Sequence, residues 1–521
     1  MGNTKQYTAE SLDRYSKEEL IETVLSLQDD LFLSAEQIAI LKSKLFGRKT
    51  EKQLPDGDEQ MTFNEFEAEA EKGTPEEPAI EETITYTRKK RVGKRDEDLK
   101  GFPVEIVKHE LTDEELTAEF GNEGYIRLAD DVYRKLEVIP ARYVVYEHHL
   151  AVYKGRKNGK FVRAPHPKEM LNNSIATPSI VASVMNAKYT NAMPLYRIEQ
   201  EFGRMGVNIN RQNMSHWVIT CAETYLSLVF DRLHRLLCER HVLQADETPV
   251  EVSKDGRPAG SKSYMWVYRT SELSEAPPII LYDYEKTRNS ERPMTFLKDF
   301  SGTLVCDGFS GYDTLAKKND RIRTANCMAH ARRPFADIVK ALGESGQKRG
   351  TTAKKALSQI QRIFHAESEL KGLSPEERLD RRRQEVKPLL EAYFAWAESI
   401  VDTVAPNSAL AKGLKYSLNR KDELSMILED GEIPLDNSAS ERAIRPFTIA
   451  RKNFVLIDTV HGAEASAIIF SLVETAKANG LKIYEYLKYL LTEIPKHMDD
   501  HDDSFVEDML PWSDNLPEEC R

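Results

Sequence analysis

Close cysteine pairs and long apolar runs are both missing from this chain of 521 residues. The five cysteines lie far apart with no Cys-x-x-Cys pair, which argues against a disulfide framework and an all-cysteine zinc site. No apolar run approaches the length of a membrane span, and the polar start MGNTKQYTAESLDRYSKEEL is unlike a secretory signal. We therefore expect reduced thiols, a cytoplasmic location and no membrane partner.

The chain lacks an overall positive charge, because its 85 acidic residues outnumber its 73 lysines and arginines and give a formal net charge of −12. Two acidic segments account for this deficit: residues 51–82 carry net −10 and residues 490–521 carry net −8, so the rest is net +6. The basic cluster RKKRVGKR at 88–95 suits a nucleic-acid phosphate backbone, and a solvated linker would explain it equally well.

With 40% hydrophobic residues, the chain can bury a large core and should form three or more domains. Near the N-terminus, apolar residues at heptad spacing predict a coiled-coil helix and self-association: Leu20, Val24, Leu27, Leu31, Ile38, Leu41 and Leu45. A lone helix packed on its own chain is the alternative. Residues 51–100 read as an acidic and then basic linker, and residues 101–170 as a small β module with an Asn-Gly turn in KNGK.

Residues 171–238 are expected to be helical and to contain a helix-turn-helix-like pair. In MPLYRIEQEFGRMGVNINRQNMSHWVIT, an apolar-periodic helix precedes a Gly206-Val207 turn and a second helix that Asn208 or Asn210 would cap. Arg211 and Gln212 would lie on that second helix, where base edges of DNA could be read. A plain helical hairpin has the same sequence pattern.

After Arg240 the pattern predicts three strands, then helix, strand, helix and strand, which is the order of a ribonuclease-H-like α/β core. The fold class we expect is therefore α/β and multidomain, with a mixed sheet. The expected boundaries are 239–345 for the first part of this core, 346–430 for a helical insertion, 431–490 for the last part of the core and 491–521 for an acidic tail.

Two aspartates follow buried strands in this core. Asp246 follows VLQA and Asp307 follows TLVC, so both are expected at the carboxyl ends of central strands, where ligands of open α/β sheets bind. Adjacent carboxylates repel one another unless a cation lies between them, and Mg²⁺ prefers such oxygen ligands. Glu247 should point to the other face of its strand, and Asp313 suits a helix cap better than a ligand.

The segment PLDNSASERAIRPF supplies a third acid, Glu441. Locally, Ser438 and Glu441 fit a capping box, Asn437 could cap instead, and Glu441 could pair with Arg445 one turn later. Pro446 should end or kink this short helix. Alternatively, Glu441 would complete a pair of metal sites with the two aspartates.

Several motifs resemble, in order along the chain, the transposases of the insertion sequence 66 family. They include LQADETPV, CDGFSGYDTL, CMAHARRPF and LDNSASERAIRPFTIARKNFVLI, with further matches in LKSKLFGRKTEK, EVIPARY, YTNAMPLYRIEQEF, SLVETAKANGLKIYEYL and MLPW. The resemblance implies a DDE transposase whose catalytic, metal-binding residues are Asp246, Asp307 and Glu441, with two Mg²⁺ or Mn²⁺ ions. It also places the pair Cys327 and His330 near the active site, although a buried cysteine and a helix-start histidine would explain the pair as well.

The expected activity is metal-dependent cleavage at the ends of an insertion sequence and transfer of the 3′-hydroxyl into target DNA. The expected partners are double-stranded DNA (terminal inverted repeats and target), a second copy of the chain and accessory proteins of the same element. Candidate DNA-contacting residues are Arg442, Arg445, Arg451, Lys452, His330, Arg332, Arg333, Arg211, Gln212, Arg88, Lys89, Lys90 and Arg91.

The resemblance has one departure and leaves two other functions open. Family members usually carry a cysteine-rich zinc module before IPAR, but LTDEELTAEFGNEGYIRLADD has no cysteine, which argues against structural zinc here. A transposase-derived DNA-binding regulator would not need the acids. A ribonuclease-H-like nuclease would share them, without needing the coiled coil or the insertion.

Overall fold

The structure is a computed structural model, and the residues it describes are most of the chain after residue 167. They are 168–258, 260–348 (without the side chains of 343–348) and 351–521, preceded by 15–17, 20–21, 23–24, 38, 104, 106, 112–120, 143–154, 156 and 160–165. The predicted coiled coil and the basic cluster at 88–95 lie outside the described residues, apart from single positions of the former. The chain divides into two units, residues 50–166 and residues 1–49 with 167–521.

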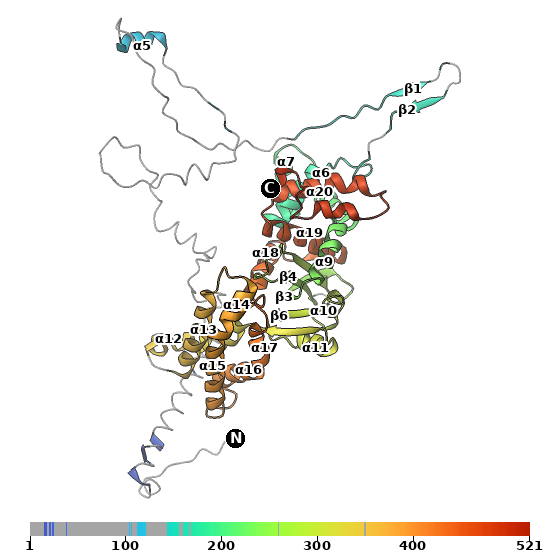
Figure 1. Cartoon of the computed structure of the whole chain (residues 1–521). Coiled ribbons are helices and arrows are strands. Elements are labelled where there is room, and N and C mark those ends of the chain that lie inside the picture. The colour runs from blue at the N-terminus through green and yellow to red at the C-terminus, as the bar shows by residue number, and fades with distance from the viewer. Residues whose placement is uncertain are drawn as a thin grey trace. The chain divides into compact units, whose positions relative to one another are not determined.

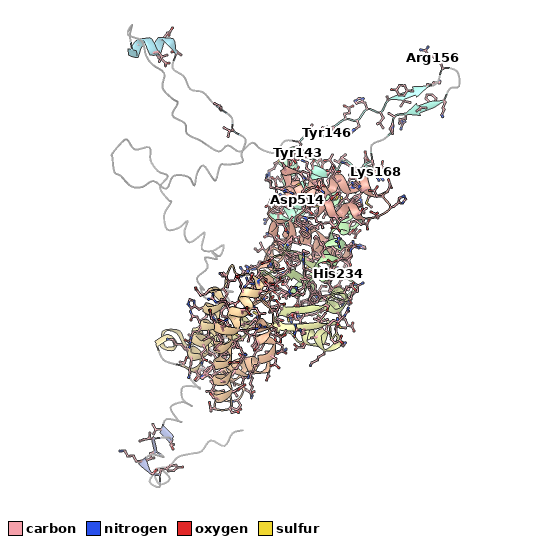
Figure 2. All side chains as sticks on the ribbon, viewed as in Figure 1. Tyr143, Tyr146, Arg156, Lys168, His234 and Asp514 are labelled. Atoms are coloured by element: carbon pink, nitrogen blue, oxygen red, sulfur yellow. The ribbon has the colours of Figure 1, made fainter. Side chains whose placement is uncertain are left out.

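The smaller unit contains a short helix and a two-stranded ribbon. Helix α5 spans Asp113–Phe120, and strands β1 (Val152–Lys154) and β2 (Phe161–Arg163) pair antiparallel. These strands lie on either side of the predicted Asn-Gly turn, as an antiparallel hairpin requires. The side chains of Tyr143 and Tyr146, labelled in Figure 2, are exposed.

The larger unit begins with helices that include the predicted helix-turn-helix. Helix α6 (Pro178–Met185) continues as the π-helical turn η2 (Asn186–Thr190), α7 spans Leu195–Arg204, α8 spans Arg211–Cys221, and η3 (Ala222–Leu226) leads into α9 (Ser227–Cys238). Gly206 turns the chain after α7 with a φ of 79°, a conformation that suits glycine. Asn210 caps α8, since its side chain accepts a hydrogen bond from the Asn213 amide at 2.8 Å.

A mixed sheet follows, and its strands match the predicted order. It contains β3 (Val242–Lys254), β4 (Lys262–Thr270), β5 (Ile280–Glu285), β6 (Gly302–Cys306) and β7 (Ile322–Asn326), with α10 (Glu291–Phe296) and α11 (Ser310–Lys318) between the later strands. The spatial order is β5-β4-β3-β6-β7. Pairing is antiparallel from β5 to β3 and parallel from β3 to β7.

Strand β3 is longer than predicted. The sequence suggested a strand that ends at Asp246, but β3 has 13 residues and Asp246 is its fifth. The prediction was wrong because β4 pairs with β3 from Leu243 to Glu251, and β8 (Ile457–Thr459) pairs with its last part. Pairing with these two strands keeps the residues after Asp246 in a strand, although several of them are polar.

Helices lie on both faces of the sheet (Figure 1). Side chains of one face, which we call face A, contact α10 and α11; examples are Tyr268 against Phe296 and Trp266 against Tyr312. The opposite face, face B, is bonded to α18 (Ser438–Phe454): Arg269 donates to the carbonyl of Ala439. The described part of the chain therefore has a helix, sheet, helix arrangement.

Residues 346–430 were predicted to be a helical insertion, and the described part, 351–430, consists of helices joined by turns. Helix α12 (Met328–Lys348) leads into α13 (Thr352–Ser368), α14 (Pro375–Arg381), η4 (Arg382–Val386), α15 (Lys387–Ile400), α16 (Ala409–Asn419), α17 (Lys421–Ser425) and η5 (Met426–Leu428). They share a hydrophobic cluster with α12 and with Val242, Val305 and Ala325 of the sheet. The same helices thus pack directly against face B.

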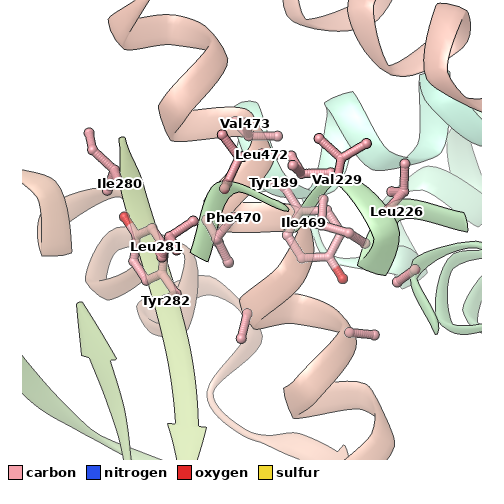
Figure 3. Close-up of a cluster of buried hydrophobic side chains, with 14 of the residues drawn as sticks. Tyr189, Leu226, Val229, Ile280, Leu281, Tyr282, Ile469, Phe470, Leu472 and Val473 are labelled. Carbon is pink, nitrogen blue, oxygen red and sulfur yellow. The ribbon is translucent and has the colours of Figure 1, made fainter. Parts of the chain in front are cut away.

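Helix α19 (Val460–Ala478) packs between the sheet and the helical segment that precedes the sheet in the chain. Figure 3 shows Phe470 and Val473 between Tyr282 of β5 and the side chains of Leu226 and Val229. Hydroxyl groups of α19 also bond the outer edge of β5, where Ser471 accepts from the Tyr282 amide at 2.7 Å. This covers an edge that could otherwise pair with another strand.

The C-terminal residues are packed rather than a free acidic tail. Helix α20 spans Ile483–His497, across the predicted boundary at 490, and is followed by η6 (Ser504–Met509) and η7 (Glu518–Cys520). Leu510, Leu516 and Cys520 are buried in the main hydrophobic cluster. Apolar residues spaced among the acids thus attach this segment to the core.

All five cysteines are free and buried, as expected for reduced thiols. Among the described residues, no helix combines the length and the apolarity that a membrane crossing requires.

Candidate active site

Asp246 and Asp307 lie at the point where two neighbouring strands separate. The parallel ladder of β3 and β6 runs from the pair Val242 and Thr303 to the pair Gln244 and Val305. Two residues further along each strand come Asp246 and Asp307, the latter directly after the end of β6. Both aspartates therefore lie at the carboxyl end of the β3 and β6 pairing, as predicted. Strand β3 itself continues beyond this point, paired with β4.

Asp307 is oriented by the turn that follows β6. Its Oδ1 accepts a hydrogen bond from the Phe309 amide at 2.9 Å, and its carbonyl accepts from Asn326 Nδ2 at 3.3 Å. An Asx turn of this kind holds a carboxylate close to its own backbone. The other carboxylate oxygen has no part in the Phe309 bond.

Glu441 is brought to face B by the start of α18. Asn437 Nδ2 donates to the Ala245 carbonyl at 2.7 Å, and Gln244 Nε2 donates to Asn437 Oδ1 at 3.2 Å. The Asn437 amide donates to Cys327 Sγ at 3.1 Å. These buried bonds tie the first turn of α18 to β3 and to the start of α12.

Of the capping predictions for α18, the N-cap position of Asn437 is confirmed, but the predicted side-chain capping bonds are not formed. Asn437 is the N-cap residue, but its side chain makes no capping bond because it is bonded to β3; the Ser438 amide instead donates to Asp436 Oδ1 at 2.8 Å. The helix also continues past Pro446 to Phe454. Burial of Ala443, Phe447 and Ala450 on that helix offsets the hydrogen bond that proline removes.

The three acids share one electrostatic environment. Burial, the charge of Glu247, and the charges of Asp307 and Glu441 raise the pKa of Asp246 to about 8, while the Glu247 amide, 2.8 Å from Asp246 Oδ1, opposes the shift. Burial is the largest of these causes, and the charges of Asp307 and Glu441 add to it because like charges disfavour a second carboxylate. Carboxylate oxygens are the ligands that a hard divalent cation prefers, so these acids are candidate ligands.

Helix α12 places a histidine and an arginine beside Glu441. His330 Nε2 lies 3.9 Å and an Arg333 Nη2 3.6 Å from Glu441 Oε1. Burial and the Arg333 charge lower the pKa of His330, which favours the neutral ring. Within the described residues, His330 Nδ1 is buried without a hydrogen-bond partner.

Cys327 has a structural environment. It is fully buried, accepts the Asn437 bond, and its own amide donates to the Cys306 carbonyl at 3.2 Å. Burial raises the pKa of its thiol to about 12, so it stays protonated at neutral pH. A metal-binding thiolate is therefore disfavoured here.

Glu247 points away from Asp246, as predicted, and is held on face A. Tyr312 donates to Glu247 Oε2 at 2.7 Å, Arg288 Nε donates to Oε1 at 2.7 Å, and burial raises the pKa of the carboxyl. Asp313 does not cap α11 as predicted, because Phe309 is the N-cap residue and both Asp313 oxygens accept from Arg420. That ion pair joins α11 to the end of α16.

The basic residues predicted to contact DNA have different environments. Arg442 pairs with Glu272 at 2.6 Å. Arg451 donates to Thr248 Oγ1 at 3.0 Å and to the Pro249 carbonyl, so it also has a structural role on β3. Residues with exposed or partly exposed side chains on α12, α18 and α8 are Arg332, Arg333, Arg445, Lys452, Arg211 and Gln212.

Sequence reasoning missed two contacts near the acids. Asn437 was considered only as a cap, although it ties α18 to β3; its place four residues before Glu441 was the available signal. Tyr416, from the helical segment 351–430, was not considered at all, and no local pattern distinguishes it. An ideal Cβ on Gly308 would lie 2.7 Å from its ring.

Among the described residues, a different group of possible metal ligands lies on the surface. Glu223, His461 and Glu464 are exposed, with ligand atoms within 4.8 Å of one another. His461 Nδ1 already bonds Glu223 at 2.8 Å, which raises the pKa of the imidazole. A histidine and glutamate ion pair accounts for this group.

Comparison with known proteins places the chain in a family of mobile-element enzymes. The family model described as Transposase IS66 family matches residues 173–465, the IS66 C-terminal element matches 471–512, and Transposase C of IS166 homeodomain matches 35–107. The chain therefore belongs to the IS66 family of transposases.

Two relatives from Sinorhizobium fredii (strain NBRC 101917 / NGR234) match over most of their length. The uncharacterized protein y4qI is 27% identical over 487 residues, which is 91% of this chain and 88% of that protein. The uncharacterized protein y4jD is 28% identical over 397 residues, 74% of this chain and 76% of that protein.

Proposed function

We propose that the protein is a DDE transposase that cleaves DNA at the ends of an insertion sequence and joins the resulting 3′-hydroxyl to target DNA. The observation that carries the proposal is the placement of three acids from separated parts of the chain. Asp246 and Asp307 lie where β3 and β6 separate, and the bond from Asn437 to the Ala245 carbonyl brings the start of α18, with Glu441, to the same strand.

The sheet supports a ribonuclease-H-like core. Three antiparallel strands followed by two parallel strands, with acids on the first strand and after the fourth, correspond to that fold. Residues 346–430 would be the insertion that precedes the last acid. A fold alone does not give an activity, so the proposal depends on the acids.

Carboxylate ligands suit hard divalent cations such as Mg²⁺ or Mn²⁺. Bound at such carboxylates, these ions would activate the attacking oxygen and stabilise the leaving oxygen of a phosphodiester. Asp246, Asp307 and Glu441 would hold them. The Asx turn at Asp307 and the Asn437 bond to β3 would keep two of the three acids in place without the ions.

Basic groups near Glu441 would bind the DNA phosphates. Arg333 is exposed and close to Glu441, so its guanidinium can neutralise that carboxylate and a phosphate oxygen together. Arg332, Arg445, Lys452 and His330 are further candidates on α12 and α18. DNA as a partner agrees with the family and with the match at residues 35–107, described as a homeodomain.

The test is cleavage of labelled element-end DNA by the purified full chain with Mg²⁺ or Mn²⁺, with the accessory proteins of the element added. Asp246→Asn and Glu441→Gln should each lower the cleavage rate by about a thousandfold or more. Glu429→Gln, which removes an exposed glutamate paired with Arg323, is the matched control and should keep the rate.

The alternatives give different results. A DNA-binding regulator would shift the DNA in a gel without cleaving it, and the acid variants would bind as wild type does. A nuclease would cleave without forming joined products. Normal cleavage by Glu441→Gln would show that Glu441 is not a metal ligand, and the proposal would then be wrong.

A further inference from the structure

Tyr416 lies on α16, in the helical segment that separates β7 from α18. Its helix packs on α12, where an ideal Cβ on Gly413 would lie 3.0 Å from the Phe335 ring. Within the described residues, Tyr416 Oη is buried and has no hydrogen-bond partner. A buried hydroxyl without a partner costs free energy, so this atom needs an explanation.

The hydroxyl is next to the residue that follows Asp307. An ideal Cβ on Gly308 would lie 2.9 Å from Tyr416 Oη and 2.7 Å from its Cε2. Real Cβ atoms do not approach so closely, so only glycine at 308 leaves room for this ring. The ring therefore lies against the backbone of Gly308, one residue from a predicted metal ligand.

The surroundings favour a hydroxyl that donates. Burial, together with the nearby Cys327 and Asp307, raises the pKa of Tyr416 although Arg420 opposes the shift. The phenol is therefore protonated at neutral pH and can give its hydrogen to an acceptor.

The Arg420 and Asp313 ion pair holds this arrangement. Arg420 follows α16 and binds both oxygens of Asp313 on α11, the helix that follows the Asp307 turn. The side chains of the pair are 18% and 24% exposed, so solvent screens them only partly. The pair thus fixes α16 against the turn on which Asp307 lies.

We propose that Tyr416 belongs to the active site and that its hydroxyl donates a hydrogen bond to an oxygen atom held at Asp307. That oxygen belongs to a metal-bound water or to a DNA phosphate. The helical segment 351–430 would then contribute a side chain to the active site in addition to supporting the fold. This inference rests on the proposed transposase function.

The test compares Tyr416→Phe with Tyr393→Phe in the full chain. Tyr393 is a fitting control because it is buried in the same helical segment and its hydroxyl bonds Ser417 Oγ at 2.8 Å, a structural contact. The readouts are Mn²⁺ affinity without DNA, measured by calorimetry, the rate of single-turnover cleavage, and the Tm.

Tyr416→Phe should keep or raise the Tm and slow cleavage by about tenfold to a hundredfold, the loss expected for one hydrogen bond to a reacting group. Tyr393→Phe should lower the Tm and keep the rate. Weaker Mn²⁺ binding by Tyr416→Phe without DNA would assign the oxygen to a metal-bound water, and unchanged Mn²⁺ binding with slower cleavage would assign it to a phosphate.

Wild-type cleavage and wild-type Mn²⁺ affinity in Tyr416→Phe would overturn the inference and leave the transposase function intact. An equal loss of rate in both variants would also overturn it, because the effect would then be structural. If the wild-type protein neither binds Mn²⁺ nor cleaves DNA, the proposed function fails and this inference fails with it.

Discussion

Asn437 Nδ2 donates a hydrogen bond to the main-chain carbonyl of Ala245, 2.7 Å away. Ala245 precedes Asp246, and Asn437 lies one helical turn before Glu441, so this bond links the segments that carry two of the three acids. The two residues are 192 positions apart in the chain. This bond therefore helps to fix the start of α18 against β3, together with the Gln244 bond to Asn437.

Asn437→Ala should weaken divalent-ion binding and slow cleavage. It removes the bond to Ala245 and leaves Gln244 Nε2 without its acceptor, at a cost of about 1–3 kcal/mol in the free energy of unfolding. Asn479→Ala is the control, because Asn479 Nδ2 makes a similar bond to the Pro278 carbonyl at 2.9 Å. Urea unfolding and Mn²⁺ titration measure both effects.

Comparing the two variants separates the effect of Asn437 on the placement of Glu441 from its effect on the stability of the fold. Asn479→Ala should lose stability to a similar extent and keep Mn²⁺ affinity. If both variants lose Mn²⁺ affinity equally, the Asn437 bond has no special role in placing Glu441.

Asp246→Asn should make the metal-free protein more stable at alkaline pH. The pKa of Asp246 is raised to about 8 in the folded state, above the value of 3.8 for an ordinary aspartate. The folded state therefore holds this proton more tightly, and the contribution of Asp246 to stability falls as pH rises between these values. The expected slope is up to about 1.4 kcal/mol per pH unit.

Unfolding curves in EDTA at several pH values between about 5 and 9 measure this slope. Asp246→Asn should show a flatter profile than wild type, and the two should converge near the acid end. Parallel profiles would mean that Asp246 is ionised in the folded protein throughout this range.

Gly308→Ala should lower both stability and cleavage. The new Cβ would meet the Tyr416 ring at 2.7 Å, so the ring or the turn after Asp307 must move. The expected cost is about 1–3 kcal/mol, typical of an overpacked site. Adding Tyr416→Ala removes the clash, so the double variant should be more stable than the two single losses predict.

Thermal or urea unfolding of the four proteins gives this double-mutant cycle. Strict additivity would show that Gly308 and Tyr416 are not in contact. Cleavage should remain low in the double variant, because the Tyr416 hydroxyl is absent.

Removing the Arg420 and Asp313 pair should loosen α16 from α11. Asp313→Asn and Arg420→Gln each break a partly buried bidentate pair, although Arg420 keeps a second pair with Glu423 at 3.6 Å. The coupling energy of Asp313 and Arg420 in a double-mutant cycle should be about 1 kcal/mol or more. Lys421→Gln is the control, because its pair with Glu398 is more exposed. The control should change the free energy of unfolding by no more than about 0.5 kcal/mol.

Local patterns predicted the elements that carry the site. The apolar run VLQA and the run TLVC are strands because alternating or continuous β-formers bury both faces, and an acid after each run is visible in one sequence. The glycine turn and the Asn210 cap before α8 were likewise predicted from local chemistry.

Predictions failed where distant segments compete with local preference. Ser438 and Glu441 match a capping box, but Asn437 bonds β3, the Ser438 amide bonds Asp436, and Glu441 lies beside His330 and Arg333. Asp313 looked like a cap until Arg420, 107 residues away, supplied a charged partner. In each case, a stronger or more buried partner replaced a weak local bond.

The sequence by itself determined which residues can do chemistry and on which kind of element each lies, because side-chain identity and hydrophobic period are local properties. Only the tertiary structure decided that Asp246 lies within a long strand, that α18 is tied to it by Asn437, and that Tyr416 lies against Gly308. Those relations depend on strand register and helix packing between segments far apart in the chain. No local pattern encodes them.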